Sequence, residues 1–98
     1  MMLRRVPPFV SPEWRQSAQG QQCTLRLDCC NHDPATVVLC HLREFGWGGT
    51  ATKPHDFLAV YACAACHAEM DARRADYADI LRALGETLTI HHIEGRIT

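Results

Sequence analysis

The chain has 98 residues, a formal net charge of −1 at pH 7 and six cysteines, which indicates one small domain whose modest core needs a staple. The charge counts against a strong non-specific DNA binder, because no overall positive field draws the protein toward phosphates. No apolar run reaches the length of a membrane span or of a secretory signal. We therefore expect a single domain over residues 1–98, cytoplasmic, with reduced thiols and no membrane partner.

The first predicted elements are an arm and a short helix. Residues 1–10 contain prolines and are expected to form an extended, flexible arm. Ser11 is a typical N-cap residue, and Pro12 suits the first position of a helix. These signals predict a helix from Pro12 to about Gln19, ended by Gly20.

The middle of the chain indicates strands and turns. Residues 23–27 alternate between polar and apolar side chains, which predicts a strand, and residues 28–34 are rich in turn formers. Residues 36–42 are β-branched and apolar, which predicts another strand that carries His41. A glycine-containing loop of about ten residues follows. Residues 57–61 are a short apolar run that could be a strand or a helical turn.

Two helices are expected in the C-terminal part of the chain. The alanine-rich segment that starts near Cys63 favours a helix carrying His67 and Asp71. From Tyr77 onward, apolar residues recur at helical spacing, which predicts a second helix packed on the core. Residues 87–93 could continue this helix or form a last strand, and the two histidines among them are expected at the surface.

The cysteines predict a structural zinc site. Cys63 and Cys66 are three residues apart and can hold one metal ion from a single tight turn. Cys23 and Cys30, from the first half of the chain, can complete a tetrahedral shell. Four thiolates leave no position for water or substrate, so we expect a structural Zn²⁺ that stabilises the fold. The choice between Cys29 and Cys30 stays open, because adjacent side chains on an extended segment point in opposite directions.

A second group of residues has the composition of a hydrolytic site. His67 and Asp71 are four residues apart on the expected helix and share one face, where they could hold a divalent ion. His41, on the expected strand, could act as general base on a water molecule. By spacing alone, a hydrogen-bonded structural role for each histidine is the competing interpretation.

A longer pattern resembles the prophage-encoded YbcO-like nuclease family. The residues that carry the resemblance are 38–43, Gly46, Gly49, Thr50, Lys53, Pro54, Asp56, 62–67, Glu69 and Asp71. That family is similar to the HNH superfamily. The resemblance therefore implies a small α+β domain with a zinc-stapled treble-clef or ββα-metal core and flanking helices. It also implies an endonuclease that hydrolyses DNA phosphodiester bonds in phage or prophage DNA metabolism.

The resemblance implies a role for each matched residue. His41 matches the general base, and Asp56 matches the middle residue that helps to hold the strand histidine or its loop. His67 matches a ligand of the catalytic divalent ion, such as Mg²⁺, Mn²⁺ or Zn²⁺, and Asp71 matches a further ligand one helical turn on. The four cysteines match the zinc site found in many HNH domains.

Two departures from the pattern support an alternative interpretation. Cys40 precedes His41 where an acidic or histidine metal ligand is common, and Asp56 lies further from the cysteine pair than is usual. The alternative is a non-catalytic zinc module that binds nucleic acid or protein and holds no metal at His67.

Other residues could contact nucleic acid directly. Trp47 could stack on a base or cap the core. The cations available for phosphate contacts are Arg4, Arg5, Arg15, Arg26, Arg43, Lys53, Arg73 and Arg74.

Overall fold

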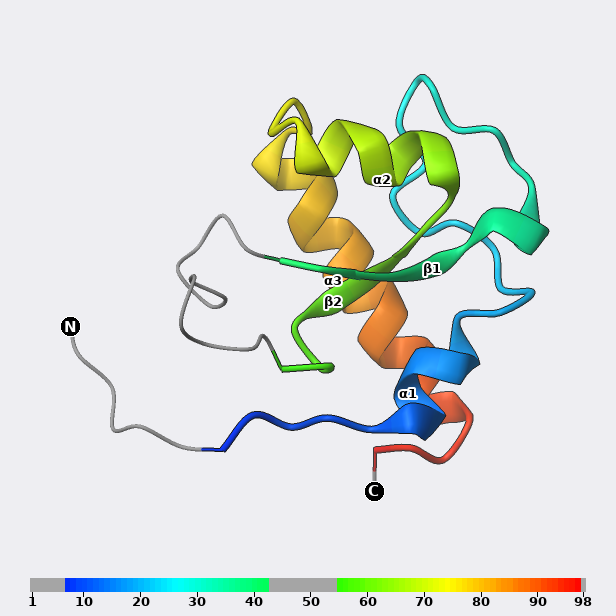
Figure 1. Cartoon of the computed structure of the whole chain (residues 1–98), viewed down its shortest axis with the longest axis vertical. Coiled ribbons are helices and arrows are strands. Elements are labelled where there is room, and N and C mark those ends of the chain that lie inside the picture. The colour runs from blue at the N-terminus through cyan, green and yellow to red at the C-terminus, as the bar shows by residue number, and fades with distance from the viewer. Residues whose placement is uncertain (1–6, 43–54, 98) are drawn as a thin grey trace, which may run out of the picture.

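The computed structural model describes residues 7–42 and 55–97. The elements, in chain order, are helix α1 (Pro12–Ser17), the 3₁₀ turn η1 (Pro34–Thr36), strands β1 (Val38–His41) and β2 (Ala59–Ala62), and helices α2 (Ala64–Asp71) and α3 (Tyr77–Ile93). The two strands form one antiparallel sheet, which α3 crosses, while α1 and α2 lie on opposite sides of it in the view of Figure 1. The expected small α+β class is confirmed.

Helix α1 forms where capping residues predict it. The Ser11 side chain accepts a hydrogen bond from the Trp14 N–H, and Pro12 begins the helix. The helix ends at Ser17, two residues before the expected end, and Gly20 turns the chain away with a φ of +81°. Trp14 is the buried residue of this helix, so it anchors the N-terminal part of the chain on the core.

The hairpin places the N-terminus of α2 and His41 at opposite ends. Val38 pairs with Ala62, directly before α2, whereas His41 pairs with Ala59 three residue steps away. Every residue of β2 is buried, and α3 packs on this strand. The sheet therefore forms the centre of the molecule. Three residue steps along the strands separate the Val38–Ala62 pair from the His41–Ala59 pair by roughly 10 Å.

The strand expected at residues 23–27 is wrong. The chain makes a turn there, with Arg26 at a φ of +46° and its N–H donated to the Cys23 Sγ. Arg82 of α3 donates its two amino groups to the carbonyls of Thr24 and Leu25, at 2.8 and 2.7 Å. The alternating pattern was misleading because only one backbone group of this segment reaches the sheet, the Thr24 N–H, which donates to the Tyr61 carbonyl at 2.8 Å. The Arg26 N–H bonds to a sulfur, and the Thr24 and Leu25 carbonyls bond to a side chain, so no strand ladder forms.

A buried polar network joins this turn to the sheet and to α3. The Thr24 hydroxyl lies 2.9 Å from the Tyr61 carbonyl and 2.9 Å from the Thr87 hydroxyl. The Tyr61 N–H in turn donates to the Thr87 hydroxyl at 3.2 Å. Three segments far apart in the sequence are thus joined by buried hydrogen bonds.

Helix α3 runs to Ile93, so residues 87–93 continue the helix and form no last strand. Its buried face is formed by Ile80, Ala83, Thr87 and His91. Leu81, one of the apolar residues in the predicted pattern, is 70% exposed. No helix in the described part of the chain is both long and apolar enough to cross a membrane.

His91 is not at the surface, as expected from the sequence, but 1% exposed. Its ring stacks on Trp14 with a centroid distance of 3.9 Å, and its Nδ1 accepts a hydrogen bond from the Arg96 Nε at 2.7 Å. Its Nε2 has no hydrogen-bond partner among the described residues. Burial, assisted by the nearby charge of Arg96, lowers the pKa of His91 to about 4. No local pattern in the sequence indicates that this histidine, and not its exposed neighbour His92, faces the core.

We predict that His91 makes the protein less stable in acid. The unfolded histidine, with a pKa near 6.5, takes up a proton before the folded one, with a pKa of about 4. The unfolded state therefore binds more protons in this window, so the free energy of unfolding falls as the pH falls, by up to about 3 kcal/mol from this residue. The stability lost in acid is fully restored above about pH 6.5, where His91 is largely unprotonated in both the folded and the unfolded state.

Urea unfolding of the wild type and of His91→Phe, at several pH values from 7.5 to 4, measures this effect. The stability difference between the two proteins should shrink or reverse as the pH falls. His92→Phe serves as control, because His92 is exposed, and should keep the pH dependence of the wild type. A difference between wild type and His91→Phe that is constant with pH would contradict the assignment.

Candidate metal centre and histidine site

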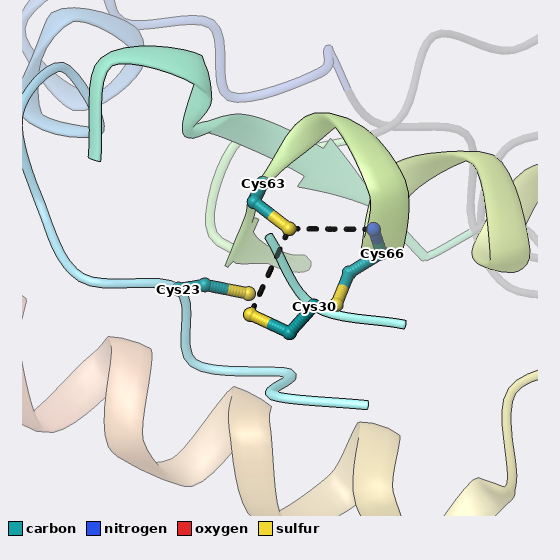
Figure 2. A group of neighbouring side chains, drawn as sticks. All are labelled: Cys23, Cys30, Cys63 and Cys66. Carbon is teal, nitrogen blue, oxygen red and sulfur yellow. Dashed lines mark hydrogen bonds between the residues drawn. The ribbon is translucent and has the colours of Figure 1, made fainter. Parts of the chain in front are cut away.

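Four cysteine sulfur atoms converge at the start of α2. The Sγ atoms of Cys23, Cys30, Cys63 and Cys66 all lie within 4.8 Å of one another. Figure 2 shows the four side chains turned toward a common centre. The Sγ atoms of Cys63 and Cys30 are 3.8 Å apart, which matches the edge of about 3.8 Å in a tetrahedron with metal–sulfur bonds of about 2.3 Å. The four cysteines are thus placed to bind a metal ion.

Backbone N–H groups support the sulfur atoms of this centre. Cys63 is the N-cap residue of α2, and its Sγ accepts the N–H of Cys66 at 3.4 Å. The same Sγ accepts the N–H of Asn31 at 3.5 Å, and the Cys23 Sγ accepts that of Arg26 at 3.5 Å. Such bonds favour a thiolate, as does the positive end of a helix dipole. The turn that begins at Cys23 and the turn that begins at Cys63 therefore each stabilise a negatively charged sulfur.

The pKa values of these thiols reflect burial and hydrogen bonding. Burial raises the pKa of Cys63, but the N–H groups of Cys66 and Asn31 outweigh it and bring that pKa down to about 7. Burial is the main reason that the pKa values of Cys66 and Cys30 are raised. Because a bound metal ion takes the place of the thiol protons, it would hold all four sulfurs as thiolates near neutral pH.

The remaining two cysteines lie outside this centre. Cys29 is exposed, and its Sγ lies 3.7 Å from the carbonyl oxygen of Ala65. Cys30, and not Cys29, faces the other sulfurs, which resolves the choice that the sequence left open. Cys40 is buried in β1. None of the six cysteines, all within the described residues, forms a disulfide.

His41 and Asp56 form a hydrogen-bonded pair at the other end of the hairpin. The Nε2 of His41 lies 2.9 Å from the Oδ1 of Asp56, whose side chain is fully buried. The Oδ2 of Asp56 accepts the N–H of Ser11 at 2.7 Å, and the Arg15 Nε contacts both carboxylate oxygens at 3.2 and 3.1 Å. Burial raises the pKa of Asp56, but the hydrogen bonds from His41, Ser11 and Arg15 lower it by more. The net pKa is below the usual value, so this carboxyl is ionised.

This pairing determines which nitrogen of His41 can react. An ionised carboxylate only accepts hydrogen bonds, so the Nε2 of His41 carries the proton that points to Asp56. In this tautomer the Nδ1 carries the lone pair of the ring, and it makes no hydrogen bond with the described residues. The His41 side chain is 16% exposed, so a small part of it reaches solvent. The pair therefore has the arrangement of a base oriented by a buried acid.

His67 and Asp71 form a separate and more exposed pair on α2. The Nε2 of His67 and the Oδ2 of Asp71 are 3.5 Å apart, as the four-residue spacing predicts. Both side chains are accessible to solvent. Among residues 7–42 and 55–97, no third Cys, His, Asp or Glu joins them in a group with ligand atoms within 4.8 Å. His41 is thus not brought into a ligand cluster with this pair.

The N-terminal segment contributes residues to the site that the sequence did not indicate. Of the arm expected over residues 1–10, residues 1–6 lie outside the described part and residues 7–10 form no helix or strand, and the Asp56 N–H donates to the Phe9 carbonyl at 2.8 Å. Ser11 was predicted only as a helix cap and Arg15 only as one of several cations. Their contacts to Asp56 cross more than 40 residues of sequence, so no local pattern reveals them. Trp47 and the glycine loop lie outside the described residues.

Comparisons with known proteins give one consistent result. The family model described as "Putative nuclease YbcO" matches residues 12–96. The chain is 47% identical over 66 residues to the "Putative nuclease YbcO" of Escherichia coli (strain K12) and to the "Putative nuclease ybcO" of Enterobacteria phage 82, which is 66% of this chain and 68% of each relative. A solved structure, "Structure of a putative bacteriophage protein from Escherichia coli str. K-12 substr. MG1655", is similar with a TM-score of 0.66 and 34% identity, over 85% of this chain and 100% of that chain.

We predict that Cys30→Ser and Cys29→Ser have opposite outcomes although the two residues are adjacent. Cys30→Ser removes one of four thiolate ligands and should abolish stoichiometric metal binding, with loss of the cooperative thermal transition. Cys29→Ser should retain the metal and the wild-type melting temperature, because its sulfur faces Ala65. Elemental analysis and circular dichroism measure both effects. Retention of the metal by Cys30→Ser, or its loss from Cys29→Ser, would refute the ligand assignment.

Proposed function

The chain belongs to the family of the "Putative nuclease YbcO", as the sequence pattern led us to expect, and we propose that it is a metal-dependent DNA endonuclease of the HNH type. In this proposal it hydrolyses phosphodiester bonds of phage or prophage DNA. The observation that carries the proposal is the His41–Asp56 pair, with its Nε2 to Oδ1 distance of 2.9 Å. A histidine held in one tautomer by a buried carboxylate is the group that activation of a water molecule requires.

His41 is the general base of the proposed reaction. Its Nδ1 accepts a proton from the water that attacks the phosphorus atom, while its Nε2–H stays bonded to Asp56. Asp56 is a positioning residue that keeps the ring in place and stabilises the imidazolium as the proton arrives. Because Ser11 and Arg15 occupy the other bonding positions of the carboxylate, Asp56 has little freedom to turn away from His41.

His67 and Asp71 are the proposed ligands of a catalytic divalent ion such as Mg²⁺, Mn²⁺ or Zn²⁺. A nitrogen and a carboxylate oxygen on one exposed helical face suit such an ion. Mg²⁺ in particular binds through one or two protein ligands and completes its shell with waters and substrate phosphates. When bound, the ion would supply positive charge to the phosphate and to the leaving oxygen.

The four-cysteine centre is proposed to hold a structural Zn²⁺. Thiolate ligands in a tetrahedral arrangement select zinc over the divalent ions that prefer oxygen. Metal-bound cysteines, in place of disulfides, are typical of the cytoplasm, which we propose as the location of the protein. A cysteine turn, a hairpin and a helix capped by a cysteine follow one another as in a treble-clef or ββα-metal core, which supports assignment of this core to the HNH type.

A second candidate function is a non-catalytic zinc module that binds nucleic acid or protein. The observation in its favour is that His67 and Asp71 have no third protein ligand within the described residues. This module would bind one zinc ion per chain and show no nicking activity dependent on a second ion. The two functions therefore differ in the response of purified protein to added Mg²⁺ or Mn²⁺.

We predict that His41→Ala lowers the rate constant of DNA cleavage by about 10²- to 10⁴-fold, the usual contribution of a general base. Its affinity for DNA and its bound zinc should not change, because His41 lies outside the thiolate centre. His92→Ala, which alters an exposed histidine on α3, is the matched control. Single-turnover cleavage of plasmid and oligonucleotide DNA gives the rate constants. Equal rates for His41→Ala and the wild type on every DNA form would refute the role of His41.

We predict that His67→Ala raises the concentration of Mg²⁺ or Mn²⁺ needed for half-maximal cleavage by about tenfold or more, because one of two protein ligands is lost. Glu69→Ala is the control, since Glu69 lies on the same helix but is bound to Arg74 at 2.8 Å. The measurement is an ion titration of the cleavage rate with structural zinc left in place. An unchanged ion dependence in His67→Ala would remove this metal assignment and leave that of His41 intact.

A further inference from the structure

Three aromatic rings form an exposed cluster next to Asp56. This aromatic cluster consists of Phe9, His55 and Phe57. The rings of His55 and Phe57 are stacked, with centroids 4.7 Å apart and planes 8° from parallel, and Phe9 lies 5.7 Å from Phe57. Phe9 and Phe57 are each 39% exposed. Rings exposed to this degree present apolar surface that another flat group can cover.

The aromatic cluster is held rigidly by the chain beneath it. The Phe9 N–H donates to the His55 Nδ1 at 2.8 Å, and the Asp56 N–H donates to the Phe9 carbonyl at 2.8 Å. Phe9 also makes an edge-on contact of 5.2 Å with the buried Trp14. In Figure 1 the blue N-terminal segment runs along the green segment that leads into β2. The rings are therefore preorganised, so a ligand would not have to order them on binding.

A half-exposed cation flanks the same segment. The Nε of Arg15 is bonded to Asp56, between His55 and Phe57 in the sequence, and its side chain is 50% exposed. Its two terminal amino groups make no hydrogen bond with the described residues. A guanidinium anchored at Nε and free at its outer edge can bind two oxygens of a phosphate. Exposed aromatic rings and a half-exposed cation thus occur together beside the His41–Asp56 pair.

We propose that the aromatic cluster binds an unpaired nucleobase of the substrate and that Arg15 binds a phosphate of the same strand. This inference rests on the proposed nuclease function and names its substrate class as single-stranded or locally unpaired DNA. A base inside a duplex has no free face, because its neighbours on the strand already cover it. An unpaired base can extend the His55–Phe57 stack, and stacking of this kind tolerates every base. The cation supplies the local positive charge that the net charge of −1 does not.

Fluorescence anisotropy with a labelled oligonucleotide tests this proposal through binding. The probe is measured as a single strand and as a blunt duplex, without added Mg²⁺ or Mn²⁺ and with zinc bound to the protein. Phe57→Leu keeps an apolar side chain but removes the ring, and should weaken single-strand binding by about tenfold while leaving duplex binding unchanged. Phe57→Trp keeps an aromatic face and should retain or improve the single-strand affinity. Arg15→Gln should weaken single-strand binding and reduce its dependence on salt.

Leu81→Ala is the matched control, because Leu81 is an exposed apolar residue on α3, away from the aromatic cluster. Its single-strand affinity should equal that of the wild type. The proposal is overturned if Phe57→Leu binds the single strand as the wild type does, if it weakens single strand and duplex equally, or if the wild type does not bind the single strand. A wild type that shows the expected Phe57 dependence but cleaves no DNA would refute the proposed nuclease function and leave the aromatic cluster as a binding site.

Discussion

The fold depends on the meeting of four cysteine sulfur atoms, three of them from buried residues, at the start of α2. Cys63 ends the connection from β2, caps α2 and faces Cys30, so one side chain joins the sheet, the helix and the N-terminal turns. A short chain with a small core needs such a link, because its buried apolar area barely offsets the entropy of ordering the backbone. The raised pKa values of Cys30 and Cys66 mean that neutral thiols, which are weak hydrogen-bond partners, are the alternative to a bound ion. A metal ion bound at these four cysteines would therefore link metal binding to folding.

Asp56 is the second point on which distant segments converge. A buried carboxylate is costly unless its charge and its lone pairs are matched, and here a histidine, a guanidinium and a backbone N–H meet it. Two of these groups come from Ser11 and Arg15, so the segment that closes the N-terminal part of the fold also sets the tautomer of His41. In this way a structural requirement, satisfaction of a buried charge, also orients the histidine that we propose as the general base.

Local patterns predicted the parts of the molecule that local interactions control. The Cys63 and Cys66 spacing, the helix that follows it and the four-residue spacing of His67 all rest on contacts within one helical turn. Residues 23–27 were assigned to a strand because alternation measures side-chain polarity, whereas a metal-binding turn is determined by sulfur ligands far away in the sequence. The burial of His91 likewise depends on Trp14, which lies 77 positions earlier and reaches it only after α1 has docked.

The hairpin register explains why the thiolate centre and the histidine pair are distinct. Cys63 follows the residue that pairs with Val38, and His41 lies three steps further along the same two strands. His67 comes one residue after Cys66, so its position in the sequence places it at the thiolate end of the hairpin. Helix α2 then runs back along the sheet (Figure 1), which is the direction that would bring its exposed face toward a substrate bound at His41. Because no third ligand joins His67 and Asp71 among the described residues, an ion at this proposed site would take its other ligands from water and phosphate. Ion and DNA would then each raise the affinity of the other, because each supplies ligands or charge that the other requires.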